Sequence, residues 1–160
     1  MRIAVLGAAG QLGRQVVRAL VARDHAVCAV VRRPPVPALG GSVQVRLADA
    51  RNKTEIRAAI NGFDVVVNVI GAGNLRRNDV ESTTTAFAVG AAQEAGVERY
   101  IAMSAGMVAL EWVIFKYILR PLIFRNILAE HCRVEEIVKT STLSWTIFRA
   151  VHRMNGDQGR

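Results

Sequence analysis

Three glycines near the start of the chain have a spacing typical of a phosphate-binding turn. Gly7, Gly10 and Gly13 follow a short apolar run and precede a stretch with helical periodicity. Such glycines allow a tight bend, close approach of a pyrophosphate and close helix packing, with the phosphates at the positive end of the helix. The same spacing occurs in purely structural turns, but its position between a strand and a helix predicts dinucleotide binding. The residues expected to contact the dinucleotide here are Gly7, Ala9, Gly10, Gln11, Leu12 and Gly13.

Two adjacent arginines indicate which dinucleotide is bound. Arg32 and Arg33 directly follow the second apolar run, where NAD-selective sites usually carry an acidic residue for the ribose 2′-hydroxyl. Residues 30–34 contain no Asp or Glu. Guanidinium groups suit a 2′-phosphate, because they form charge-assisted and often bidentate hydrogen bonds. We therefore expect NADP(H) to be preferred over NAD(H), the alternative being a solvated pair of loop residues.

Small and polar residues follow three later strands. Asp49 and Ala50 come after the third strand, and the Asp49 carboxylate can either accept from an adenine amino group or cap the next helix. Gly71 and Ala72 end the fourth strand, where small residues let the cofactor lie against the sheet edge. Ser104 ends the fifth strand, and we expect its hydroxyl to face the crevice where nicotinamide and acceptor would meet. The alternative is a serine in a structural turn.

The elements that position these residues alternate along the whole chain. Strands are predicted at residues 2–6, 26–31, 43–47, 63–70, 98–103 and 143–149. Helices are predicted at 11–23, 54–60, 79–95 and, with a break or kink at Pro121, 109–139. Valine-rich runs without alternation suit a parallel sheet covered on both faces. The pattern predicts a single α/β domain over residues 1–160, a Rossmann-like doubly wound parallel sheet with helices on both faces. Right-handed crossovers would line up the ends of its first, fourth and fifth strands along one crevice.

Composition narrows the function classes. A chain of 160 residues fits one domain with a real core, and 51% of its residues are hydrophobic. The formal net charge is +8, but the basic residues are mostly scattered, so we expect no nucleic-acid partner. The apolar segment from Trp112 to Phe124 contains charges and a proline and falls short of the ~18 residues that a membrane span needs. With no export segment and two cysteines expected to be buried free thiols, the predicted location is cytoplasmic.

The motifs together resemble the atypical short-chain dehydrogenase/reductases, in the NAD(P)-binding, NmrA-like branch that includes biliverdin reductase B (flavin reductase). The resemblance covers about residues 1–157, and the matching pieces are residues 7–13, 31–34, 47–49, Gly71, 103–106 and 144–149, with Glu135 or Glu136 ahead of the last strand. It implies NADPH as cofactor and hydride delivery to flavins or other conjugated, quinone-like acceptors. It also implies that Ser104 and His152 line the acceptor site, although a histidine in a tail is more often a solvated surface residue.

The chain departs from this family pattern in two respects. It has no Tyr-x-x-x-Lys pair, since Tyr100 is followed by Ser104 and Tyr117 by Pro121. This weakens the case for ketone chemistry and keeps a non-catalytic NADP(H) sensor or regulator, or a fold that binds nothing, as alternatives. Ala150 stands where the family usually has proline, and the chain stops soon afterwards. We expect apolar sheet surface to be exposed and a homodimer to bury it together with the segment from Trp112 to Phe124.

Overall fold

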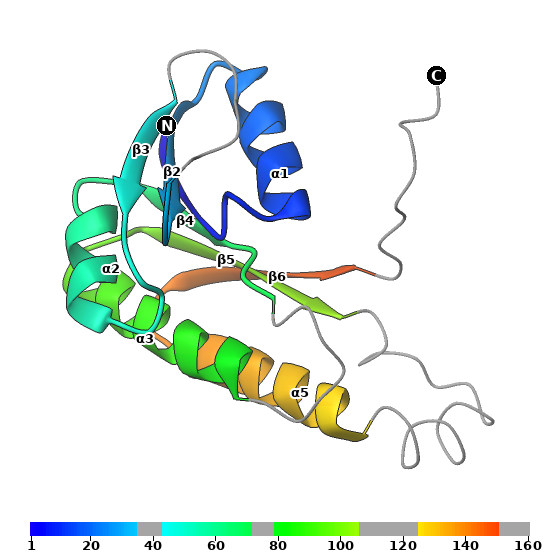
Figure 1. Cartoon of the computed structure of the whole chain (residues 1–160). Helices are drawn as coiled ribbons and strands as arrows, with labels where there is room; N and C mark the ends of the chain where they lie inside the picture. The colour runs from blue at the N-terminus through cyan, green and yellow to red at the C-terminus, as the bar shows by residue number, and fades with distance from the viewer. Residues whose placement is uncertain (35–42, 72–78, 106–124, 151–160) are drawn as a thin grey trace, which may run out of the picture.

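The computed structural model of the chain describes residues 1–34, 43–71, 79–105 and 125–150. Strands and helices alternate along these ranges, as predicted (Figure 1). The strands are β1 (Arg2–Leu6), β2 (Ala26–Val31), β3 (Gln44–Leu47), β4 (Val65–Asn68), β5 (Arg99–Ala105) and β6 (Ser144–Ala150). The helices are α1 (Gln11–Val21), α2 (Lys53–Ile60), α3 (Val80–Glu94) and α5 (Arg125–Lys139).

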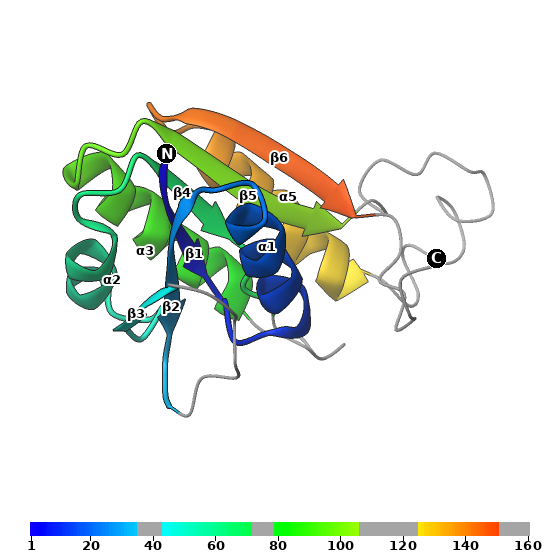
Figure 2. The ribbon, with the colours of Figure 1, turned by 90° about the horizontal axis from the view of Figure 1, so that it is seen from above.

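The strands form one parallel sheet in the order β3-β2-β1-β4-β5-β6. The chain builds outwards from β1 to β3 and then from β4 to β6, so its direction of growth reverses between β1 and β4. In open α/β sheets, ligands bind at the carboxyl ends of the strands beside such a reversal. Helix α1 lies on one face of the sheet, and α2, α3 and α5 lie on the other (Figure 1, Figure 2). This is the Rossmann-like doubly wound fold that the sequence predicts.

Each face of the sheet has its own apolar cluster, because successive strand residues point to opposite sides. Leu6 and the fully buried Tyr100 pack in the cluster that includes Ile56 and Ile60 of α2. On the other face, Val5 packs in the cluster that includes Val17 of α1. The central strands β1 and β4 are therefore covered on both sides, which fixes the carboxyl edge where the predicted site residues gather.

Strand β4 is shorter than the predicted range 63–70, because polar groups act at both of its ends. Before the strand, the Asp64 carboxylate accepts hydrogen bonds from the backbone N–H and the guanidinium of Arg2, at 2.8 and 2.7 Å. After it, the side-chain oxygen of Asn68 accepts from the Ile70 N–H at 3.1 Å. This local bond between Asn68 and Ile70 competes with the strand ladder and starts the turn that leads to Gly71.

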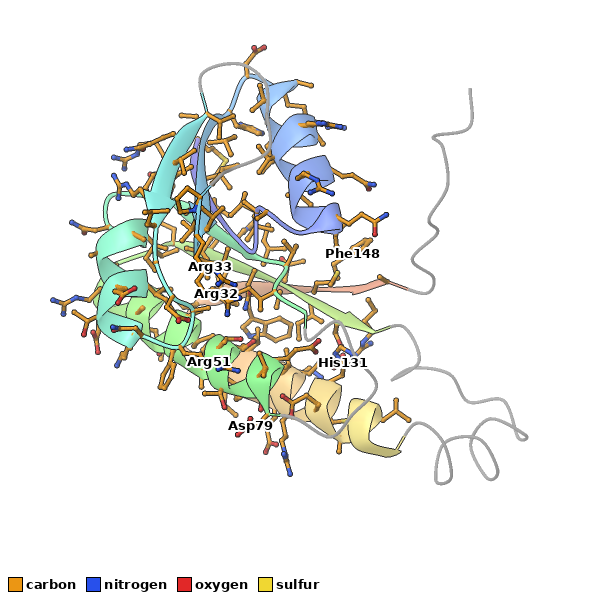
Figure 3. The ribbon with its side chains drawn as sticks, viewed as in Figure 1. Arg32, Arg33, Arg51, Asp79, His131 and Phe148 are labelled. Atoms are coloured by element: carbon orange, nitrogen blue, oxygen red, sulfur yellow. The ribbon has the colours of Figure 1, made fainter. Side chains whose placement is uncertain are left out.

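The edge strand β6 carries exposed apolar side chains, as expected. Phe148 is 64% exposed and Trp145 is 41% exposed. Phe148 pairs in register with Met103 and lies on the α1 side of the sheet (Figure 3). Within the described ranges, α1 is the only helix on that side, and it packs on β1 and β2. The predicted dimer segment from Trp112 to Phe124 lies outside the described residues.

Two further predictions meet the structure here. Cys28 is buried as predicted, but the prediction for Cys132 is wrong, because this thiol lies on an exposed part of α5. The part of the predicted long helix that is described, α5, is helical, while Pro121 lies outside the described residues. No helix in the described ranges has the length and apolar character required to span a membrane.

Candidate functional site

The glycine turn joins β1 to α1, and its geometry leaves no room for side chains. Gly7 has a φ of +81°, a conformation that favours glycine. A Cβ atom on Gly13 would lie 2.1 Å from the carbonyl oxygen of Gly7, and one on Gly10 would lie 3.2 Å from the same atom. Helix α1 begins at Gln11 with neither a side-chain cap nor an acidic residue in its first turn. The turn thus forms a backbone cradle that fits a pyrophosphate.

A cavity of about 470 Å³ opens beside this turn, at the carboxyl edge of the sheet. Several residues predicted from the sequence line it: Gly7, Ala9, Gly10, Arg32, Asp49, Ala50 and Gly71. Other predicted residues are described but not part of this lining: Gln11, Leu12, Gly13, Arg33 and Ser104. Ala72 and His152 lie outside the described residues. The lining also includes residues that the sequence analysis missed, namely Arg51 after β3 and Val80 and Thr84 of α3.

Three arginines lie around one side of the cavity. Arg32 directly follows β2 and lines the cavity, and Arg33 beside it is exposed (Figure 3). Arg51 approaches from the segment between β3 and α2, and its backbone N–H donates to the Asp49 carboxylate at 2.9 Å. This side of the cavity therefore presents guanidinium groups, with the Asp49 carboxylate engaged in a local turn.

The helix-cap alternative for Asp49 is wrong. The N-cap of α2 is Asn52, whose side-chain oxygen accepts from the N–H groups of Thr54 and Glu55, at 3.1 and 3.3 Å. Asp49 lies three residues before this cap and lines the cavity instead. The adenine alternative for Asp49 stays a prediction.

A buried polar network holds the end of β4. The side-chain nitrogen of Asn68 donates to the Tyr100 hydroxyl at 2.9 Å and to the Thr85 hydroxyl at 3.3 Å, while its oxygen accepts from Ile70. Ile70 in turn lies against the glycine turn, since a Cβ atom on Gly7 would be 3.1 Å from it. Complete burial raises the pKa of Tyr100 above its ordinary value, so this phenol stays protonated and acts as a structural group.

Ser104 is buried at the carboxyl end of β5, on the side that faces α5. Its hydroxyl has no partner within hydrogen-bonding geometry among the described residues, but it lies near enough to the Glu135 carboxylate to help lower the pKa of that group. The largest cause is Arg149, whose guanidinium donates to both carboxylate oxygens at 2.8 and 2.6 Å. Burial opposes the shift and Lys139 adds to it, and the resulting pKa of Glu135 is about 2. Arg149, which lies in the matching piece 144–149, thus ties β6 to α5.

A second set of buried charged groups lies where α3 meets α5, and the sequence analysis did not single it out. One Glu130 oxygen accepts from the backbone N–H of Ser82 at 2.8 Å, so α5 supplies a capping group for the first turn of α3. The Nδ1 atom of His131 lies 3.4 Å from a carboxylate oxygen of Glu81. Both side chains of this pair are nearly buried, with exposed fractions of 11% and 13%.

The fold, the glycine cradle and the cavity together define a Rossmann-like dinucleotide-binding protein. A family model described as NAD(P)H-binding matches residues 7–160, and the chain belongs to this family. The match includes the glycine turn, the arginine pair and the strand β6.

Known proteins extend this likeness. A 3-diazoavenalumate denitrifying reductase from a Streptomyces species is 34% identical over 124 residues, which is 68% of this chain and 39% of that protein. An NADPH-dependent quinone oxidoreductase from Escherichia coli, solved with NADPH, is 25% identical with a TM-score of 0.74, over 92% of this chain and 48% of that chain. A triphenylmethane reductase from a Citrobacter species shares the fold at 22% identity and a TM-score of 0.72, over 93% of this chain and 48% of that chain. The chain spans between 14% and 39% of the length of the curated relatives that it matches.

Proposed function

We propose that the chain is an NADPH-dependent reductase of small conjugated acceptors of the flavin or quinone type. The observation that carries this proposal is the cavity between the glycine cradle and the arginine-bearing ends of β2 and β3. When bound, the reduced nicotinamide supplies a hydride, so the protein needs few catalytic side chains of its own. The likeness to a reductase at 34% identity and to the NADPH-bound quinone oxidoreductase supports this assignment.

The preference for NADP(H) over NAD(H) rests on charge. Arg32 and Arg51 line the same cavity, and Arg33 is exposed beside them. A 2′-phosphate at this place would meet guanidinium donors, whereas no carboxylate stands at residues 30–34 to hold a 2′-hydroxyl. We assign the pyrophosphate to residues 7–13 and the adenosine end to Asp49 and Ala50.

The reacting end of the cofactor would lie past Gly71, over the carboxyl ends of β4 and β5. Ser104 stands at the end of β5, but its hydroxyl is turned towards α5 and is 2% exposed as a residue. We retain Ser104, with His152, as a proposed acceptor-site residue.

Cofactor titration and turnover together test the proposed function. Binding of NADPH and NADH is followed by nicotinamide fluorescence and by the rise in melting temperature, and oxidation of NADPH is followed with a soluble quinone or flavin. We expect tighter binding of NADPH and acceptor-dependent oxidation. Failure to bind either cofactor would contradict the assignment of the cavity. Tight binding without turnover would instead favour the non-catalytic sensor. The burial of Tyr100 and the lack of a Tyr-x-x-x-Lys pair are consistent with that alternative.

We further propose a homodimer that covers the exposed edge strand β6. Phe148 on the α1 side of the sheet and Trp145 on the α5 side are large, exposed apolar side chains of this edge strand, and exposed apolar surface commonly marks an interface. Sedimentation velocity over a range of concentrations tests this. Association that is weakened by Phe148→Ser supports the dimer, and a monomer at all concentrations excludes it.

A further inference from the structure

His131 is a buried histidine on α5 with no role in the proposed function as described above. It is 9% exposed, and its Nδ1 atom has no hydrogen-bond partner among the described residues, although a carboxylate oxygen of Glu81 lies 3.4 Å away across the α3–α5 interface, within ion-pair distance. Glu130, the preceding residue, is also buried, and one of its carboxylate oxygens has no hydrogen-bond partner among the described residues, although it lies 3.8 Å from the guanidinium of Arg133. Burying polar groups without full hydrogen bonding costs free energy. The presence of two such groups at one place therefore indicates a candidate functional site.

The position of His131 connects it to the proposed site. Helix α5 runs antiparallel to β5 and β6, and Glu135 lies opposite Arg149 near the carboxyl end of β6. His131 is one helical turn closer to the start of α5, about 6 Å further towards the carboxyl edge of the sheet. Figure 3 shows it beside the end of β5.

The partner of His131 provides a second connection. Glu81 follows Val80 in the first turn of α3, and Val80 lines the dinucleotide cavity. Glu81 is thus the neighbour in sequence of a residue of the cavity wall, while Glu81 and His131 themselves are not part of the cavity lining.

We propose that His131, positioned by Glu81, donates the proton that a quinone-type acceptor requires when it is reduced. This inference rests on the proposed function. A carboxylate at Nδ1 orients an imidazole ring and balances the charge of its protonated form, which leaves Nε2 to transfer a proton. The chain lacks a Tyr-x-x-x-Lys pair, and Tyr100 is buried in the Asn68 network, so this tyrosine is not placed to supply the proton.

Reduction of a quinone to a hydroquinone requires both a hydride and a proton. A quinone gains one hydride from NADPH and one proton from His131, which gives hydroquinone and NADP⁺, and solvent then reprotonates the imidazole. A cationic triphenylmethane dye gains one hydride and becomes the neutral leuco dye, with no proton transferred. The two acceptors therefore differ in whether a proton donor is needed.

The other polar groups around His131 are less suited to donate this proton, because each is a carboxylate held by other residues or a buried hydroxyl. Glu81 faces it from α3, and Glu130 and Glu135 flank it on α5. Ser82 and Arg133 contact the Glu130 carboxylate, and Arg149 and Lys139 contact that of Glu135. From β5, the fully buried Tyr100 and Ser104 face the same helix. Among the described residues, no group of three or more His, Cys, Asp or Glu is placed to hold a metal ion, so a metal role is not indicated for the pair.

The closing experiment compares the two acceptors in three proteins. NADPH oxidation by wild type, His131→Gln and Glu81→Gln is measured with a soluble quinone and with a cationic triphenylmethane dye across pH. We expect His131→Gln to slow quinone reduction about 100-fold and to remove its decline at high pH, while dye reduction stays unchanged. Glu81→Gln should give a smaller loss with the quinone alone. The matched control is His25→Gln, which changes a histidine at the amino edge of the sheet and should alter neither rate.

A second readout is independent of turnover. The imidazole signals of His131 are followed by NMR while a hydroquinone is added to the protein without NADPH, and we expect them to shift in wild type. Equal losses with both acceptors in His131→Gln, or signals that do not respond, would overturn the proton-donor role and leave the proposed function standing. An absence of turnover by wild type with both acceptors would overturn the proposed function and this role with it.

Discussion

Gly13 makes the tightest approach in the phosphate turn. We expect Gly13→Ala to lower the free energy of unfolding by about 1–3 kcal/mol, because its Cβ would overlap backbone atoms that cannot move aside. It should also abolish NADPH binding, since the turn must open to admit the methyl group. Urea unfolding and a fluorescence titration measure the two effects. The control is Gly62→Ala, which strains a φ of +85° in open space and should lose stability but keep NADPH binding.

Arg32 determines the cofactor preference in the proposed function. Arg32→Asp should weaken NADPH binding about tenfold and improve NADH binding, because it replaces a phosphate donor with an acceptor for the 2′-hydroxyl. Arg51→Gln should weaken NADPH alone, since Arg51 lines the same cavity. Arg99→Asp makes the same change of net charge at the amino edge of the sheet, and it should leave both dissociation constants unaltered. A similar loss in Arg99→Asp would assign the effect to total charge.

The ion pair between α5 and β6 makes a pH-dependent contribution to stability. The pKa of Glu135 is about 2 in the folded chain against an ordinary value of 4.5, chiefly because Arg149 hydrogen bonds to the carboxylate. A carboxyl group with a lowered folded pKa stabilises the fold fully above its unfolded pKa, and this contribution is lost as the pH falls towards 2. We expect Glu135→Gln to cost about 1–3 kcal/mol at pH 7 and progressively less below pH 4.5.

Denaturant unfolding at several pH values measures this difference. Glu136→Gln is the matched control, because Glu136 is the exposed neighbour on the same helix and should show no such dependence. A gap between wild type and Glu135→Gln that stays constant down to pH 2 would mean that the carboxylate is not the stabilising form.

The arrangement of the elements could be predicted from the sequence because its signals are local. Continuous valine-rich runs identify the buried strands, and their alternation with helical stretches indicates parallel βαβ units with helices on both faces of the sheet. Some of the interactions that fix the ends of the elements are not local. Glu130 reaches Ser82 over 48 positions, and Asn68 reaches Tyr100 over 32.

The same distinction holds for the candidate site. The glycine turn and Arg32 could be predicted because each lies in a motif next to a strand end. Arg51 could not, because it becomes a site residue only when separate segments meet at one sheet edge, and the Glu81–His131 pair could not, because it joins two helices that are far apart in the sequence. For Asp49 the sequence left two alternatives open, and the capping role went to Asn52, three residues further along.

At the scale of the whole molecule, the net charge of +8 and the exposed arginines beside the cavity predict a salt dependence that differs between cofactors. NADPH carries one phosphate more than NADH, and exposed charges are screened strongly as the Debye length falls from about 10 Å at 0.1 M to about 3 Å at 1 M salt. Added salt should therefore weaken NADPH binding more steeply than NADH binding, so that the preference for NADPH narrows. Titrations of both cofactors over this range measure the two slopes. In Arg32→Asp the slopes should converge, because the guanidinium that meets the additional phosphate is gone. Parallel slopes in wild type would mean that a buried, unscreened contact or shape alone sets the preference, which would contradict the role of the arginines at the ends of β2 and β3.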